Sequence, residues 1–181
     1  MTADFAQVLA AVSAASPVGR ASTVIVAIDG FSGAGKSTLA GRVLAEVSGT
    51  VVHTDDFAAW DNPLDWWPRL IEQVLVPLSN DEAARYQRYD WDAQQLAEWH
   101  AIEPGGLVVV EGMSSSRGKF RPYLSLLVWV DAPRELRLKR GIERDGERMR
   151  GAWLDWMASE DEWAAEEDPR SHADLIVSGT R

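Results

Sequence analysis

The chain contains no cysteine among its 181 residues. Disulfide bonds, thiolate catalysis and cysteine-bound zinc are therefore excluded. Histidine is scarce as well, and its three scattered residues make a histidine metal site an unexpected feature. No apolar run approaches the roughly 18 residues that a membrane span requires. These absences argue against thiol and disulfide chemistry, a cysteine or histidine metal site and a membrane-spanning segment.

Basic residues are the minority among the charged side chains. Lys and Arg number 18 against 28 Asp and Glu, which gives a net charge of −10. An acidic chain disfavours nucleic acids and anionic membranes as partners, although a local basic cleft can still hold a phosphate. Hydrophobic residues make up 46%, an ordinary proportion for a folded domain. The N-terminus lacks the basic start of a secretory signal, so we expect a cytoplasmic protein.

Short apolar runs alternate with helical patterns along the chain. Runs rich in β-branched residues predict strands at 23–28, 50–53, 107–110, 126–130 and 173–177. Apolar residues at helical spacing predict helices at 5–12 and 39–47, from Pro68 to about 78, and from Pro133 to about 142. This alternation is typical of an α/β fold with a parallel sheet. Because no linker or repeat interrupts it, we expect a single domain over residues 1–181.

The most specific motif is a phosphate-binding loop, Gly30-Phe-Ser-Gly-Ala-Gly-Lys-Ser37, which matches G-x-x-x-x-G-K-[ST] between a predicted strand and a predicted helix. Glycines let the backbone turn its N–H groups toward phosphate oxygens, and the helix N-terminus adds further donors. Lys36 would neutralise β- and γ-phosphate charge, and the Ser37 hydroxyl would bind Mg²⁺. We expect Mg·ATP or another nucleoside triphosphate to bind to Gly30, Ser32, Gly33, Ala34, Gly35, Lys36, Ser37 and Thr38.

Other motifs follow this loop in a selective order. They are Asp55-Asp-Phe57 after the second strand, Tyr89-Asp-Trp91 in mid-chain, Val110-Glu-Gly112 after the third strand, and Arg137-Leu-Lys-Arg-Gly-Ile-Glu-Arg144. The chain has no guanine-reading N-K-x-D tetrapeptide, and a single acid follows the third strand where motor ATPases usually carry two. From about Thr23 to Gly179, the sequence resembles the uridine kinase branch of the phosphoribulokinase/uridine kinase family.

The resemblance implies a P-loop NTPase three-layer sandwich. Its five-stranded parallel sheet would have the order 2-3-1-4-5, and a small lid would cover about 141–155. The implied enzyme is a phosphotransferase that moves the ATP γ-phosphoryl group to a hydroxyl of a nucleoside-like acceptor, with uridine or cytidine first. Asp55 would be the catalytic acid or base that orients the acceptor hydroxyl. Glu111 would hold Mg²⁺ through water or contact the acceptor.

Three arginines, Arg137, Arg140 and Arg144, share one face of the predicted helix after Pro133. The resemblance implies that Arg140 and Arg144 act with Lys36 in catalysis and that Arg137 contacts substrate. The alternative is an exposed helix face on which these arginines pair with Glu135, Glu143 and Asp145.

Aromatic residues fall into two groups. Tyr89 and Trp91 resemble the aromatic pair beside the nucleobase in uridine kinases, with ordinary core packing as the alternative. Trp153, Trp156 and Trp163 recur at helical spacing, and Trp66 and Trp67 precede a proline. We expect the tryptophans of this second group to cover the hydrophobic core and not to form a binding site.

Two departures from the family pattern concern the acceptor. Gln94 stands where these kinases usually carry a base-contacting histidine, and Gly141 replaces the second of two adjacent arginines. These departures leave two other functions open. One is a kinase for another small alcohol, such as pantothenate, a sugar or nicotinamide riboside, and the other is a non-catalytic nucleotide sensor. The family commonly encloses adenine with a segment beyond the last strand. We expect the adenine site here either to be more open or to be completed by the N-terminal helix or by another subunit of a homo-oligomer.

Overall fold

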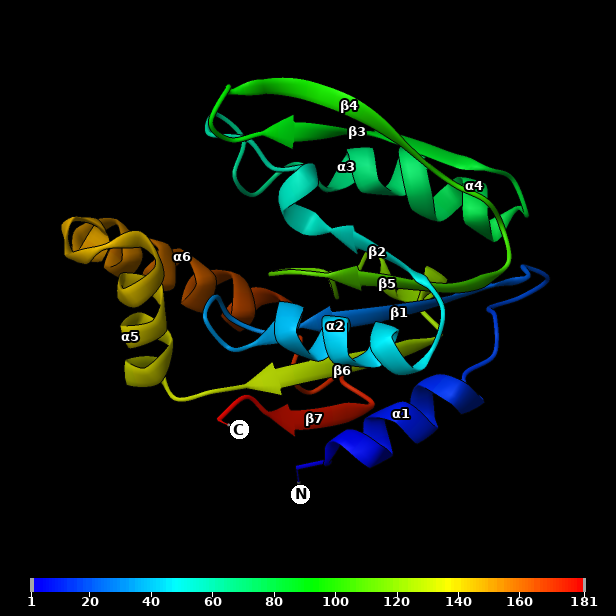
Figure 1. Cartoon of the computed structure of the whole chain (residues 1–181), viewed down its shortest axis with the longest axis horizontal. Helices are drawn as coiled ribbons and strands as arrows, with labels where there is room; N and C mark the ends of the chain where they lie inside the picture. The colour runs from blue at the N-terminus through cyan, green and yellow to red at the C-terminus, as the bar shows by residue number, and fades with distance from the viewer. Residues whose placement is uncertain (1, 181) are drawn as a thin grey trace.

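The computed structural model describes residues 2–180. Its main sheet has five parallel strands, which are β1 (Thr23–Asp29), β2 (Thr50–His53), β5 (Gly106–Glu111), β6 (Leu126–Asp131) and β7 (Leu175–Ser178). They lie in the order β2-β5-β1-β6-β7 (Figure 1). Renumbered among themselves, these strands read 2-3-1-4-5, so the predicted sheet and its strand order are confirmed.

Helices connect the strands much as the sequence pattern predicts. The longer ones are α1 (Phe5–Ala14), α2 (Lys36–Glu46), α5 (Arg134–Asp145) and α6 (Arg150–Glu167). Between β2 and the next strand, α3 (Trp67–Leu70), a π-helical turn η2 (Ile71–Leu75) and α4 (Val76–Ser79) form one helical segment. Short 3₁₀ turns are η1 (Thr54–Asp56), η3 (Arg121–Tyr123) and η4 (Glu147–Met149).

The sheet is buried on both faces, which produces three layers. Along β1, Val26 and Ile28 pack with α1 and α2 on one face, and Ile25 packs with the α3–α4 segment on the other. Trp129 of β6 packs against Trp163 of α6. This alternation explains why the strands read as continuous apolar runs, as strands of a doubly covered parallel sheet do.

An antiparallel hairpin lies outside the main sheet and is absent from the sequence prediction. It consists of β3 (Ala84–Asp90) and β4 (Gln95–Ile102) and lies over the α3–α4 segment (Figure 1). Ala84, Tyr86 and Ile102 are its buried residues, and most of the rest is polar or exposed. Because few of its positions are buried and polar residues interrupt its apolar ones, the hairpin lacks the hydrophobic run that reveals the other strands.

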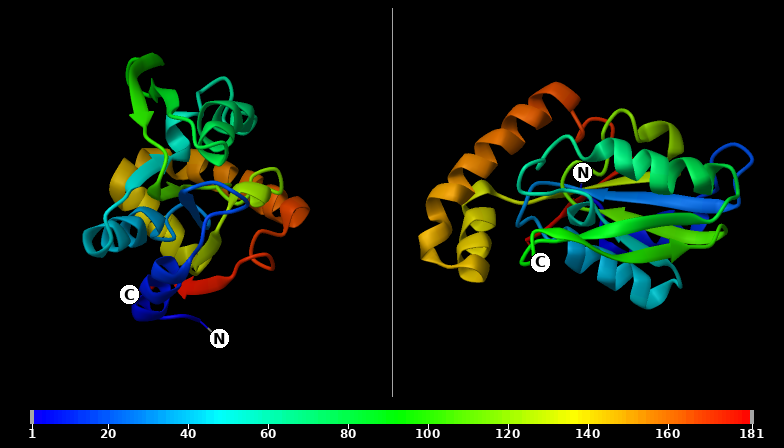
Figure 2. Two further views of the ribbon diagram at one scale, coloured as in Figure 1. Left: turned by 90° about the vertical axis from the view of Figure 1, so that its right-hand side faces the viewer. Right: turned by 90° about the horizontal axis from the view of Figure 1, so that it is seen from above.

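The carboxyl ends of all five parallel strands point toward α5 and α6 (Figures 1 and 2). Ligands of open α/β sheets bind at this edge, because the loops that leave the strands converge there. Within residues 2–180, no helix is long and apolar enough to cross a membrane.

Candidate active site

The phosphate-binding loop leaves β1 and enters α2 at Lys36. Gly33 has φ +76°, and a Cβ there would lie 2.7 Å from the Arg137 carbonyl oxygen, so the position requires glycine. The first turn of α2 has N–H groups without intrahelical partners, and its positive dipole end faces the same cavity. This cavity of about 310 Å³ is lined by the predicted loop residues Ser32, Gly33, Gly35, Lys36, Ser37 and Thr38. Gly30 and Ala34 are buried and do not line it.

A lysine, a hydroxyl and a carboxylate meet inside this cavity. The Lys36 Nζ donates to the Phe31 carbonyl oxygen at 3.1 Å, and its side chain is buried. The Ser37 hydroxyl donates to Glu111 Oε1 at 3.1 Å. Hard oxygen donors of this kind fit Mg²⁺, so Ser37 and Glu111 are the residues that would hold the ion.

His53 is a member of this cluster that the sequence analysis does not include. His53 ends β2 and Glu111 ends the neighbouring strand β5. The His53 Nδ1 lies 2.5 Å from Glu111 Oε1. The hydrogen bond to Glu111 raises the pKa of His53. Because Ser37 and His53 both bind the Glu111 carboxylate, the carboxylate is held in one orientation.

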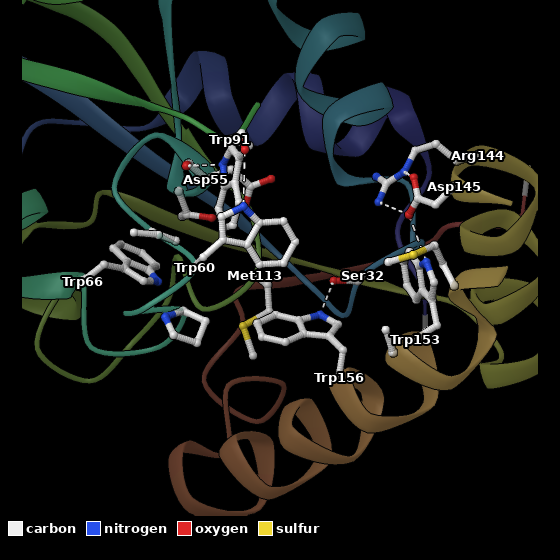
Figure 3. A pocket seen from close by; sticks show the side chains of 16 residues that line it. Ser32, Asp55, Trp60, Trp66, Trp91, Met113, Arg144, Asp145, Trp153 and Trp156 are labelled. Carbon is white, nitrogen blue, oxygen red and sulfur yellow. Dashed lines mark hydrogen bonds and ion pairs between the residues drawn. The ribbon is translucent and has the colours of Figure 1, made fainter. Parts of the chain in front are cut away.

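Asp55 lies in η1 and lines both the phosphate cavity and a second cavity beside it. Its side chain is exposed in the cleft and lies close to Trp91 (Figure 3). Partial desolvation by the cleft walls raises the pKa of Asp55; Lys36 opposes the shift, and the Glu111 charge adds to it. The next residue, Asp56, instead accepts a hydrogen bond from the Tyr86 hydroxyl at 3.1 Å.

Two of the three predicted arginines reach the cleft. Arg140 lines the phosphate cavity, and its guanidinium donates to the carbonyl oxygens of Gly33 and Gly179 at 3.0 and 2.8 Å. Arg144 lines both cavities and is exposed. It also pairs with Asp145 at 2.8 Å, as the alternative interpretation of the helix face expects.

Arg137 is placed differently from both expectations. It is 4% exposed and lines neither cavity, so the predicted substrate contact is replaced by a structural one. Its Nη1 lies 3.3 Å from Glu160 Oε2, and its guanidinium lies over the Phe31 ring. The fully buried Glu160 also accepts the Ser32 N–H at 2.7 Å. This buried ion pair therefore ties α5, α6 and the phosphate-binding loop together.

The second cavity is about 360 Å³ in volume and is walled by tryptophans (Figure 3). Trp153 and Trp156 come from α6, and the others come from segments before the third parallel strand. The tryptophans that line it are Trp60, Trp66, Trp91, Trp153 and Trp156. A flat ring that enters this cavity therefore meets aromatic surfaces beside Asp55.

The predicted aromatic pair is split by the structure. Trp91 lines the cavity, whereas Tyr89 does not and packs edge-on against the Trp91 ring at 5.3 Å. Conversely, Trp66, Trp153 and Trp156 line the cavity although the sequence pattern favours hydrophobic cover for them. The three-residue spacing of Trp153 and Trp156 predicts a shared helix face, but nothing in it tells a core face from a pocket wall.

A third cavity of about 760 Å³ lies on the other side of the loop. It shares Gly35, Thr38 and Arg140 with the phosphate cavity. Its further walls come from the N-terminal segment at residues 2–6, from Arg42 and from the end of β7. The Arg42 guanidinium lies 3.9 Å from the centre of the Phe5 ring.

This fold, with a phosphate-binding loop at the carboxyl edge of its sheet, defines a P-loop nucleotide-binding protein. A model of the phosphoribulokinase/uridine kinase family matches residues 56–168, more than half of the chain. The chain therefore belongs to the phosphoribulokinase/uridine kinase family. Membership of this family supports the interpretation of the protein as a small-molecule kinase.

Curated relatives agree with this assignment. A uridine kinase of Staphylococcus haemolyticus is 26% identical over 144 residues, which cover 69% of this chain and 70% of the relative. A uridine kinase of Staphylococcus aureus is 24% identical over 152 residues, which cover 74% and 73%.

Solved structures share the fold. A "Possible Uridine Kinase" from Bacillus stearothermophilus superimposes with a TM-score of 0.71 at 19% identity, covering 96% of both chains. A Silicibacter protein named with reference to a fructose transport system kinase superimposes with a TM-score of 0.67 at 17% identity, covering 96% of this chain and 98% of the other.

Proposed function

We propose that this protein transfers the γ-phosphoryl group of Mg·ATP to a hydroxyl of a small, nucleoside-like acceptor. The observation that carries the proposal is the position of Asp55, which lines both the phosphate cavity and the tryptophan-walled cavity. A carboxylate at that junction can meet a hydroxyl from one side and a phosphoryl group from the other. Uridine and cytidine are the first acceptors to test, because the curated relatives are uridine kinases.

In the proposed reaction, Asp55 accepts the proton of the acceptor hydroxyl and orients its oxygen. That oxygen forms a bond to the γ-phosphorus, the bond from this phosphorus to the bridging oxygen breaks, and ADP leaves with the electron pair. Lys36, Arg140 and Arg144 offset the negative charge of the phosphates during transfer. Ser37 and Glu111 would hold Mg²⁺, which would supply further charge neutralisation on the phosphate oxygens.

The arrangement of the three cavities supports one orientation of the bound triphosphate. A triphosphate over Gly35 to Thr38 would have its reacting end toward Asp55 and its nucleoside end toward the third cavity. There the Arg42 guanidinium and the Phe5 ring offer a stacked surface to a base. We therefore propose that the N-terminal segment forms one wall of the adenine site.

Two alternatives differ in their consequences. A kinase for another small alcohol would use the same phosphate machinery with a different occupant of the tryptophan-walled cavity. A nucleotide sensor would bind Mg·ATP and would need no carboxylate at the junction. The position of Asp55 favours an enzyme over a sensor, since binding alone does not require a base.

The test is ADP release by the purified protein with Mg·ATP and a panel of nucleosides, pantothenate, sugars and nicotinamide riboside. We expect turnover with a ring-bearing acceptor and a fall of about 10²- to 10⁴-fold in kcat for Asp55→Asn. Mg·ATP binding should persist in this variant. The matched control is Asp56→Asn, because Asp56 lines neither cavity. Turnover that survives Asp55→Asn would contradict the proposed role.

A further inference from the structure

The tryptophan-walled cavity offers few polar groups to an occupant, because its indole N–H groups already have partners. Trp60 Nε1 donates to the Trp91 carbonyl oxygen at 3.3 Å, and Trp91 Nε1 donates to the Asp55 carbonyl oxygen at 3.0 Å. Trp153 Nε1 donates to Asp145 at 2.9 Å. Trp156 Nε1 donates to the Ser32 hydroxyl at 2.9 Å. Four of the five indoles therefore present ring faces and C–H edges to the cavity.

The polar side chains of this cavity gather at one end. Ser32, Asp55 and Arg144 also line the phosphate cavity. The other two, Thr54 and Asp145, are chain neighbours of Asp55 and Arg144. The remaining lining residues are alanine, proline, methionine and tryptophan. Most of the polar side chains therefore lie on the border with the phosphate cavity, which Met113, Trp153 and Trp156 also line. Beyond that border, the cavity is apolar apart from Thr54 and Asp145.

We infer that the acceptor is an alcohol whose body is an apolar aromatic ring, with its hydroxyl directed toward Asp55. This inference rests on the proposed function and narrows its acceptor class. A ring with several polar edge atoms, such as uracil, would leave some of them without hydrogen-bond partners against this wall. Each such buried, unpaired group lowers affinity by about tenfold or more. A sugar, with hydroxyls on all sides, meets the same penalty.

The test compares acceptors that share a hydroxyl and differ in the ring. Uridine is compared with the C-riboside in which a phenyl ring replaces uracil, and free ribose is the third acceptor. The full chain is assayed with Mg·ATP for ADP release, and binding is followed by tryptophan fluorescence. We expect kcat/KM for the phenyl riboside to exceed that for uridine by about tenfold or more, with a lower Kd. Equal or better use of uridine would overturn the inference.

The outcomes separate this inference from the proposed function. If the phenyl riboside binds more tightly than uridine but neither is phosphorylated, the kinase proposal fails and the ring preference holds. If uridine is phosphorylated with the higher kcat/KM, the kinase proposal holds and the ring preference fails. If none of the three binds, the inference is overturned.

A variant of the cavity wall adds a second measurement. Trp60 is 61% exposed, so Trp60→Ala is expected to leave the fold intact. It should raise the Kd and KM for the phenyl riboside about tenfold with little change in kcat, since stacking binds without taking part in transfer. Trp60→Phe should restore most of the affinity. The control is Trp99→Ala on β4, which is 54% exposed and lies outside the cavity. An unchanged Kd for Trp60→Ala would contradict the proposed wall.

Discussion

The two halves of the cleft are built in opposite ways. The phosphate cavity is built around one continuous loop, to which folding adds the acids Asp55 and Glu111 and two arginines of α5. Most of its side chains are charged or hydroxylated, and Met113, Trp153 and Trp156 complete its lining. The tryptophan-walled cavity is assembled from η1, the loop before α3, the turn after β3 and α6, and it is mostly apolar. The centre of the phosphate cavity is thus local in sequence, whereas the tryptophan-walled cavity depends entirely on segments brought together by folding. The same phosphate machinery can therefore serve different acceptors.

The largest effect is expected at the phosphate end. Lys36→Ala removes a buried cation from the phosphate cavity, and kcat for ADP release should fall by about 10²- to 10³-fold. Steady-state kinetics with saturating acceptor measure the change. Lys139→Ala is the matched control, because Lys139 is exposed and pairs with Glu143 on the surface of α5. An equal loss of kcat in the two variants would contradict the proposed role of Lys36 in the phosphate cavity.

The largest loss of stability is expected at the buried ion pair that ties α5 and α6 to the phosphate-binding loop. Glu160→Ala leaves the buried Arg137 without its partner and the Ser32 N–H without its acceptor. The free energy of unfolding should decrease by about 3–5 kcal/mol, as measured by urea denaturation. Glu162→Ala on the exposed side of the same helix should change it by less than about 0.5 kcal/mol. A small effect at Glu160 would show that the ion pair does not tie the helices to the loop.

A pH effect should follow from the position of Asp55 between the two cavities. Burial raises its pKa above the ordinary 3.8, with Lys36, Glu111, His53 and Arg144 as the other charges that act on it. A base must be ionised, so kcat should fall as the pH falls through this raised pKa, by about tenfold per pH unit below it.

The pH prediction needs a control because His53 also titrates. Its pKa is raised by the Glu111 hydrogen bond, but protonation of a histidine is not the event that we propose to limit transfer. The acid limb of kcat should therefore persist in His53→Asn. Loss of the limb in that variant would assign it to His53 and not to Asp55.

The smallest effect is expected behind the cavity wall. Tyr89 supports Trp91 through an edge-to-face contact without lining the cavity. Tyr89→Leu should weaken acceptor binding by about 0.5–1.5 kcal/mol, the usual strength of an aromatic pair. Trp91→Leu, which removes the wall itself, should raise the acceptor KM more. Initial rates over a range of acceptor concentrations measure both variants, and a larger effect at Tyr89 would place it in the wall.

The sequence by itself determined the strands of a parallel sheet and the phosphate-binding loop, because these depend on apolar periodicity and on residues adjacent in the chain. The strand order was predicted from the family resemblance and not from periodicity. The sequence did not reveal the β3–β4 hairpin, whose few buried positions, such as Tyr86, make no continuous run. Helical spacing put Arg137 on one face with Arg140 and Arg144, and the family resemblance implied a substrate contact for it. Spacing specifies a shared face and not what that face meets. The buried Glu160, distant in sequence, decides that Arg137 is structural.

The tryptophan-walled cavity was decided by the tertiary structure alone. Trp60, Trp91 and Trp156 come from three separate segments, and each indole alone is as well suited to a core as to a cavity wall. Packing leaves space between them, and the internal hydrogen bonds of their N–H groups make that space apolar. Local patterns therefore determine the phosphate-binding loop, and only long-range packing determines the shape and the polarity of the cavity beside it.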